Sequence, residues 1–133
     1  MTTREASDIQ EKRIAKHLSD FGCKKVSGSG SGDWQKGDCK TDDLFIEAKT
    51  SLSPKSSFSI KLDWLKKAKE QAFSMGKFIY TLVFCFGDDV DWYTVDSDTF
   101  KEFYRCYKAV ERLDYELENN KSLSIDDVKE ILK

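Results

Sequence analysis

The segment GDCKTDDLFIEAKT, residues 37 to 50, places two carboxylates and an amine around the end of an apolar strand. Side chains alternate between the two faces of a strand, so Glu47 and Lys49 share one face. Asp38 belongs to the strand before it, and neighbouring strands in a sheet lie about 4.8 Å apart. The two strands can therefore bring the carboxylates of Asp38 and Glu47 close to one point.

An oxygen-rich site of this kind suits a divalent metal ion. Two carboxylates, a backbone carbonyl such as that of Ala48, and water molecules are the ligands that Mg²⁺ or Mn²⁺ prefers. An ammonium group at Lys49 can stabilise the charge of a developing phosphorane, or help a water molecule to lose its proton. The spacing therefore indicates hydrolytic phosphoryl chemistry at the end of this strand.

A helix is predicted over residues 3 to 22, ending at Gly22, and it supplies a third carboxylate. Glu11 lies three, four and seven residues before apolar positions of this helix and should point inward with them. Glu5 is out of phase with these positions and should face solvent. Glu11 can therefore complete the metal site. The inner stripe is expected to consist of Ile14, Ala15, Leu18 and Phe21.

The rest of the chain alternates between strand and helix patterns. The expected elements are a short strand at 23–27, a Gly/Ser turn at 28–32, a hairpin of strands 33–40 and 43–49, a helix at 62–76, a buried strand at 77–86, a strand at 88–95, a helix at 100–117, and a last helix capped by Ser124 with Asp127. This order predicts an α/β fold, with helices flanking a small mixed β-sheet. We expect a single domain over residues 1–133, with its core at roughly 8–96 and a helical segment at 97–133.

Composition favours an intracellular protein with no membrane partner. The longest apolar run, residues 78–86, is too short to span a bilayer, and the polar N-terminus does not resemble a signal peptide. The four cysteines contain no C-x-x-C pair, which disfavours a zinc site, and are expected to fill the core.

Charge is distributed unevenly along the chain. Residues 1–80 contain 15 Lys and Arg against 11 Asp and Glu, whereas residues 81–133 contain 7 against 13. The basic side chains of the first part can follow phosphates. They can equally form the solvated face of an amphipathic helix, and the sequence leaves both interpretations open. This basic group consists of Lys55, Lys61, Lys66, Lys67, Lys69 and Lys77.

Each of these signals also has a simpler explanation. In a chain with 35% charged residues, an Asp close to some E-x-K is common by chance. Glu47 and Lys49 could form an exposed ion contact worth less than about 1 kcal/mol. Asp33 competes with Asp38 as the first carboxylate. Trp34 and Trp64 could stack on bases, but tryptophan more often packs in a core.

The order of these features resembles the PD-(D/E)xK nuclease superfamily, and within it the archaeal-type Holliday junction resolvases and related phage nucleases. The similarity spans roughly residues 8–86, although Gly37 stands where the motif usually has proline. The residues that carry it are EKRIAKHL at 11–18, the SGSGSG turn, Asp38, LFIEAK at 44–49, Gln71, and the apolar strand FIYTLVF at 78–84.

The resemblance implies a restriction-endonuclease-like core and a Mg²⁺- or Mn²⁺-dependent DNA endonuclease with no small-molecule cofactor. Glu11, Asp38 and Glu47 would bind the metal, and Lys49 would assist catalysis. It also implies branched DNA as the substrate, a homodimer, and a role for a serine of the turn. The candidate DNA-binding residues are Ser29, Ser31, Lys55, Lys61 and Lys66. The alternatives are a non-catalytic nucleic-acid-binding module on the same fold, or a nuclease of the same superfamily with another substrate, such as an exonuclease or an enzyme for single strands or RNA.

Overall fold

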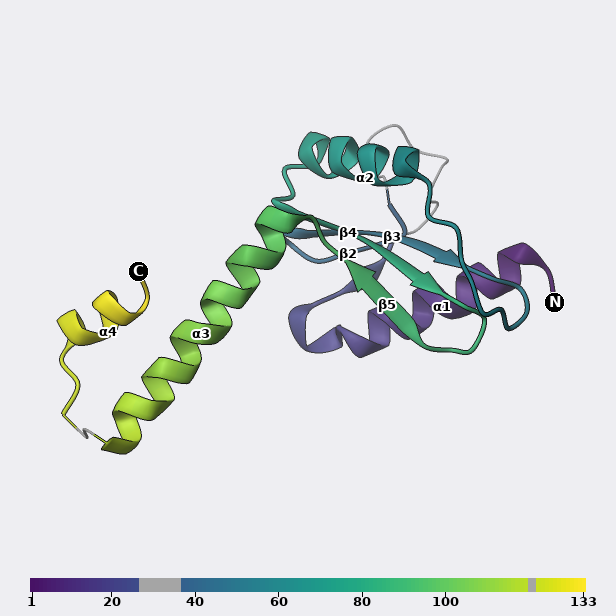
Figure 1. Cartoon of the computed structure of the whole chain (residues 1–133). Coiled ribbons are helices and arrows are strands. Elements are labelled where there is room, and N and C mark those ends of the chain that lie inside the picture. The colour runs from purple at the N-terminus through teal and green to yellow at the C-terminus, as the bar shows by residue number, and fades with distance from the viewer. Residues whose placement is uncertain (27–36, 120–121) are drawn as a thin grey trace. The chain divides into compact units, whose positions relative to one another are not determined.

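The computed structural model describes residues 1–26, 37–119 and 122–133 (Figure 1). The chain divides into two compact units, Met1–Val95 and Asp96–Lys133. The helices and strands, in chain order, are α1 (Thr3–His17), the 3₁₀ turn η1 (Ser19–Phe21), β1 (Lys24–Lys25), β2 (Cys39–Lys40), β3 (Leu44–Thr50), α2 (Leu62–Ser74), β4 (Ile79–Cys85), β5 (Asp91–Thr94), α3 (Ser97–Asn119) and α4 (Ile125–Ile131).

The first unit is built on a five-stranded mixed sheet with the order β1-β2-β3-β4-β5. β1, β2 and β3 are antiparallel neighbours, and Cys39 lies opposite Ile46 in the β2–β3 pair. β3 and β4 run parallel, with Glu47 opposite Leu82, because α2 carries the chain back between them. β5 then returns antiparallel to β4. The predicted α/β class and mixed sheet with flanking helices are confirmed.

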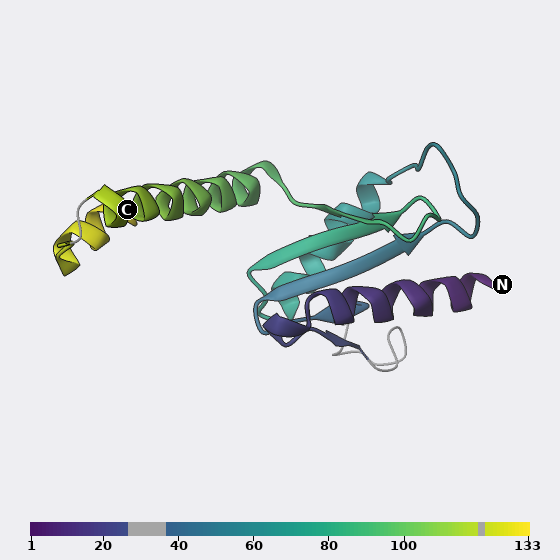
Figure 2. The same ribbon diagram turned by 90° about the horizontal axis from the view of Figure 1, so that it is seen from below.

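The two faces of this sheet are covered by different helices. Figure 1 shows α2 on one face and α1 on the other, and Figure 2 shows α1 from below. Ile46 packs with Ile14 of α1, whereas Phe45 packs with Ala68 of α2. Since side chains alternate along β3, Glu47 shares the α2 side with Phe45. The charged face of β3 therefore lies beneath α2.

Helix α1 begins with a capping box and ends earlier than the sequence predicts. Thr2 caps the helix, and its amide donates a hydrogen bond to the Glu5 side chain at 2.8 Å. Glu5 is exposed, as expected. The α-helix ends at His17 and a 3₁₀ turn leads to Gly22, whose φ is 73°. This turn leaves Phe21 73% exposed. The prediction that Phe21 belongs to the inner stripe is wrong, because the tighter turn rotates it away from the sheet.

The second unit consists of α3 and α4, which pack against each other. The Ser124 side chain accepts a hydrogen bond from the Asp127 amide, which confirms the predicted cap. Arg105 of α3 donates from Nη1 to the Leu132 carbonyl at 3.0 Å. Ala109 is the buried residue of α3. One side of α3 therefore carries its contacts with α4.

The burial of the cysteines and the absence of a membrane span are also predicted from the sequence. All four cysteines are free, and Cys23, Cys39 and Cys85 are buried as predicted. Cys106 is exposed on α3, so the prediction that every cysteine fills the core is wrong for it. In the part of the chain that the structure describes, no helix is long and apolar enough to cross a membrane.

Candidate active site

Glu47 and Lys49 lie next to each other near the end of β3. The Lys49 Nζ atom is 3.8 Å from Oε1 of Glu47, and the side chains are 32% and 26% exposed, respectively. Both belong to the face of β3 that lies beneath α2. An acid and an amine are therefore held together where the strand meets the surface.

Asp38 is fixed against β3 by two hydrogen bonds. Its amide donates to the Ile46 carbonyl at 2.9 Å, and its Oδ2 accepts from the Ala48 amide at 2.7 Å. Ile46 and Ala48 lie two residues apart, so their backbone groups leave β3 on the same edge. The Ala48 carbonyl is therefore directed to the edge where the Asp38 carboxylate lies.

Gly37 sets the backbone turn that leads into Asp38. Its φ is +86°, in the left-handed region that favours glycine. A Cβ atom there would lie 2.7 Å from the Phe45 ring and 3.2 Å from the Ile46 carbonyl oxygen. Only glycine fits this position without displacing β3 or Asp38.

Glu11 reaches the same region from α1. It is 8% exposed, as the helical phase predicts, and its carbonyl accepts a hydrogen bond from Sγ of Cys39 at 3.4 Å. Lys25 of β1 lies 3.3 Å from Oε2 of Glu11 and also pairs with Asp8. The Glu11 carboxylate is thus held between the start of the sheet and Asp38.

The electrostatics show that the three carboxylates form one cluster. Burial, followed by the charge of Asp38, raises the pKa of Glu11 to about 7. Burial and Asp38 also raise the pKa of Glu47 to about 7, against the opposing effect of Lys49, and Glu11 adds to the increase. Glu11 and Glu47 are costly to ionise because they are removed from water and lie near Asp38. A proton or a cation would relieve this repulsion.

The donor set fits a hard divalent cation in its chemistry. Carboxylate oxygens of Glu11, Asp38 and Glu47, with the Ala48 carbonyl, are the oxygen ligands that Mg²⁺ and Mn²⁺ prefer. Within the described ranges, no group of three or more His, Cys, Asp or Glu side chains is already arranged to hold a metal ion. Asp38 instead accepts a hydrogen bond from the Ala48 amide, and Lys25 pairs with Glu11.

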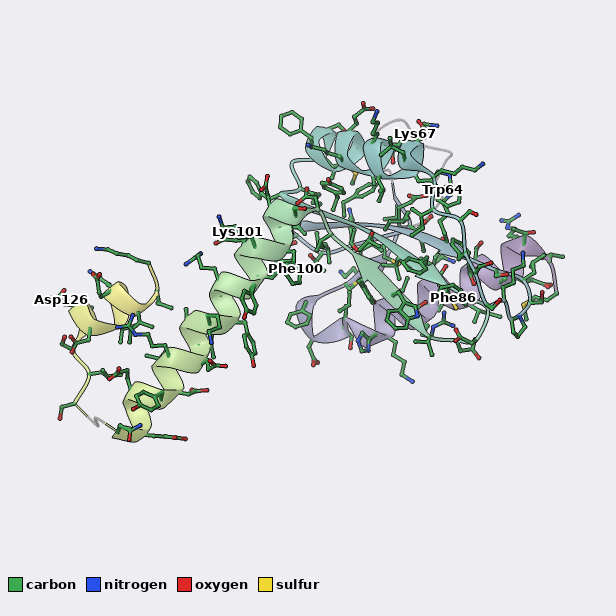
Figure 3. The ribbon with its side chains drawn as sticks, viewed as in Figure 1. Trp64, Lys67, Phe86, Phe100, Lys101 and Asp126 are labelled. Atoms are coloured by element: carbon green, nitrogen blue, oxygen red, sulfur yellow. The ribbon has the colours of Figure 1, made fainter. Side chains whose placement is uncertain are left out.

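A cavity of about 200 Å³ opens between the charged face of β3 and α2. Figure 3 shows Trp64 and Lys67 of α2, two of the residues that line this cavity. Lys49 lies over the Trp64 ring, with Nζ 4.7 Å from its centroid. Gln71, which the family resemblance includes, also lines it. The full lining is Glu47, Lys49, Asp63, Trp64, Lys67, Ala68 and Gln71.

Only some of the candidate DNA-binding residues lie near this cavity. Lys61, the N-cap residue of α2, lies 5.6 Å from the Trp64 ring centroid. Lys66 is exposed on α2 and Lys55 in the loop after β3, and neither lines the cavity. Lys67, which the sequence analysis placed in the basic group but not among the candidate DNA-binding residues, does line it. Ser29 and Ser31, with Asp33 and Trp34, lie outside the described residues.

A polar network that sequence reasoning missed joins α1 to the ends of the strands. Gln10 is 1% exposed and donates from Nε2 to the Lys49 carbonyl at 3.0 Å. Arg13 pairs with Asp91 of β5 through two hydrogen bonds of 2.7 Å. The Gln10 bond fixes the helix that carries Glu11 to the strand that carries Lys49, and the Arg13 bonds fix the same helix to β5. A Gln one residue before the inward Glu was the available signal.

No protein-family model, curated protein or solved structure matches this chain. The function of the site is therefore inferred from its own geometry and electrostatics, together with the resemblance of its motif.

Proposed function

We propose that this protein is a divalent-metal-dependent endonuclease of the PD-(D/E)xK type that hydrolyses phosphodiester bonds in branched DNA. One observation carries the proposal: Glu11 of α1, Asp38 just before β2 and Glu47 of β3 share one electrostatic cluster, with Lys49 beside it. A surface ion pair alone would not explain one buried and one half-buried carboxylate whose pKa values are both raised to about 7. In that proposal the first unit is a restriction-endonuclease-like core.

The residues of the site would have two roles, metal binding and stabilisation of negative charge. Glu11, Asp38, Glu47 and the Ala48 carbonyl would hold Mg²⁺ or Mn²⁺, which when bound polarises the phosphodiester and acidifies the attacking water. Lys49 presents a positive charge beside this cluster and stabilises the negative charge that the phosphate gains during attack. Hydrolysis would leave a 5′-phosphate and a 3′-hydroxyl.

The choice of DNA, and of branched DNA, rests on the resemblance to the junction resolvases. The cationic residues at the N-terminal half of α2 support binding of a phosphate backbone next to the cavity. They cannot distinguish a junction from a linear duplex, because backbone contacts carry no information on sequence or branching.

A homodimer belongs to the same proposal, since two sites related by symmetry can cut two strands of a junction. The aromatic side of α3 supports it. The exposed apolar residues follow a spacing of three and four, as in two-stranded helical packing. They are Phe100, Phe103, Tyr107, Val110 and Leu117, with Asp114 interrupting the series.

The deciding experiment is a cleavage assay with Mg²⁺ that offers a four-way junction, linear duplex, single-stranded DNA and RNA in parallel. Glu47→Gln and an EDTA reaction serve as negative controls. Glu70→Gln, an exposed acid of α2 that does not line the cavity, is the matched substitution expected to retain activity.

Symmetric cleavage of the junction alone, lost in Glu47→Gln and in EDTA, would support the full proposal. Cleavage of other substrates with the same losses would support the nuclease and reject the preference for branched DNA. Junction binding without any cleavage would reject the enzyme in favour of a non-catalytic DNA-binding module.

A further inference from the structure

The ammonium group of Lys49 has two neighbours that restrict where it can lie. It is 3.8 Å from a carboxylate oxygen of Glu47 and 4.7 Å from the centroid of the Trp64 ring. A lysine side chain has a flexible four-carbon stem, and ordering it costs conformational entropy. A second contact, in addition to that with Glu47, therefore decides whether the Lys49 ammonium points toward the carboxylate cluster or toward solvent.

Trp64 is well placed to provide this second contact. It lies in the first turn of α2, and its amide donates to the Lys61 carbonyl at 3.0 Å. The helix is anchored on β3 farther along, where Ala68 and Ala72 pack against Phe45. The indole is thus carried by an element whose position relative to β3 is set by a buried apolar contact.

The environment of Trp64 does not match that of a residue that only fills the core. The apolar cluster beneath α2 is formed by Phe45, Ala68 and Ala72, with other side chains packed around it. Trp64 instead lines the cavity beside Glu47, is only half-buried, and has a second cation, Lys61, 5.6 Å from its centroid. Two ammonium groups, those of Lys49 and Lys61, therefore lie within the distance of the ring at which cation–π contacts form.

We propose that Trp64 is the positioning residue for Lys49: its indole holds the Lys49 ammonium beside Glu47 through a cation–π contact. The inference rests on the proposed nuclease function, because Lys49 acts on the reacting phosphate only in that function. Trp64 itself does not touch the reacting atoms. Its contribution is to keep Lys49 in the orientation from which the charge of the phosphate is stabilised.

The test compares Trp64→Leu, which removes the aromatic face, with Trp64→Phe, which retains one. Cation–π contacts of this kind correspond to about a 3- to 30-fold effect on an equilibrium or a rate. In single-turnover assays with the enzyme in saturating excess over DNA and with saturating Mg²⁺, Trp64→Leu should cleave about 3- to 30-fold more slowly than the wild type. Trp64→Phe should recover most of the rate, and DNA affinity should change by less than about twofold.

A second measurement does not depend on activity. In NMR spectra, the ε-methylene protons of Lys49 should be shifted by the ring current of the indole, and a Lys49→Met variant assigns the signal. The shift should disappear in Trp64→Leu and persist in reduced form in Trp64→Phe. Phe73→Leu, which replaces an 85% exposed aromatic on the same helix, is the matched control and should change neither measurement.

The outcomes separate this inference from the function on which it rests. If Lys49→Met is inactive but Trp64→Leu cleaves at the wild-type rate, the positioning role is rejected and the nuclease proposal stands. If Trp64→Leu weakens DNA binding with an unchanged rate at saturation, Trp64 stacks on bases and the inference is again wrong. If Lys49→Met cleaves normally, both proposals fail. Trp64→Met replaces Trp64→Leu should the latter not fold.

Discussion

The Ala48 amide donates a hydrogen bond to Oδ2 of Asp38 at 2.7 Å, which joins the residue before β2 to the edge of β3. This contact places the Asp38 carboxylate between Glu11 on α1 and Glu47 on β3, whose pKa values it raises. Asp38 is therefore the centre of the cluster. It connects α1 to β3 at the part of the β3 edge that lies beyond the β2 pairing at Cys39.

Asp38→Asn should abolish cleavage without unfolding the protein. The asparagine keeps an oxygen that can accept from the Ala48 amide, but it removes the negative charge that opposes ionisation of Glu11 and Glu47. The metal-free variant should therefore be as stable as the wild type at neutral pH, or more stable. Thermal unfolding and the junction assay measure the two effects. Retained cleavage would remove Asp38 from the site.

The metal-free protein should lose stability as the pH rises from about 4.5 to about 7. Glu11 and Glu47 both have pKa values raised from 4.5 to about 7 by burial and by Asp38, against opposing effects of Lys25 and Lys49. Below the lower value, both acids are protonated in the folded and the unfolded chain. Between the two values the unfolded chain releases these protons while the folded chain retains them, so the free energy of unfolding falls.

Urea denaturation at about pH 5 and about pH 8 measures this change. Mg²⁺ should raise the midpoint more at the higher pH, because a cation binds the ionised carboxylates. A Glu11→Gln/Glu47→Gln double variant should show a flatter pH dependence and little response to Mg²⁺. A wild-type midpoint that rises over the same range would contradict the raised pKa values.

Local periodicity was sufficient to predict the parts of the site that depend on one element or one hairpin. The two-residue period of β3 places Glu47 beside Lys49, and the helical period of α1 turns Glu11 inward. The same reasoning failed at Phe21, where a 3₁₀ turn replaces the last turn of the predicted helix. Periodicity describes an element only as far as that element continues.

Contacts between distant elements could not be predicted in this way. The pairing of Lys49 with Trp64 depends on how α2 lies on the sheet, and the bond from Gln10 to the Lys49 carbonyl joins residues 39 positions apart. The place of Gln10 beside the inward Glu11 indicates that it can lie near the sheet, but neither this glutamine nor Trp64 shows in the sequence which distant group it contacts. These contacts follow from tertiary packing, which single-sequence patterns do not encode.

Gly37→Ala should destabilise the protein more than Gly22→Ala and should also slow cleavage. Both glycines have positive φ, 86° and 73°, and an alanine in this region costs roughly 1–2 kcal/mol. At Gly22 the added Cβ meets nothing within 4 Å, whereas at Gly37 it would lie 2.7 Å from the ring of Phe45. The additional destabilisation of Gly37→Ala therefore arises next to Asp38, where a shift of the backbone would move its carboxylate.

Urea denaturation of the two variants measures this difference, with single-turnover cleavage at saturating Mg²⁺ as the second readout. We expect Gly22→Ala to cleave at close to the wild-type rate once the protein is folded, because it lies away from the carboxylate cluster. Equal destabilisation of the two variants would show that Phe45 and β3 accommodate the methyl group. Unchanged cleavage in Gly37→Ala would show that the turn does not set the position of Asp38.

A Phe103→Glu/Tyr107→Glu double variant should prevent self-association. Within the second unit, α4 contacts the side of α3 that carries Ala109, and helical geometry places Phe103 and Tyr107 on the opposite side. Phe100, Tyr104 and Tyr107 stack in succession along this aromatic side. Pairing with a second copy would bury it, and two carboxylates there would oppose that burial.

Size-exclusion chromatography with light scattering measures the mass directly. Wild-type protein is expected to elute as a dimer, and the double variant as a monomer with unchanged far-UV circular dichroism. Lys101→Glu, which adds negative charge to the same helix next to Phe100 but outside the aromatic series, is the matched control and should remain dimeric (Figure 3). A wild-type protein that stays monomeric over a wide concentration range would reject the homodimer. In that case the double variant and the wild type should cleave the strands of a junction in the same way.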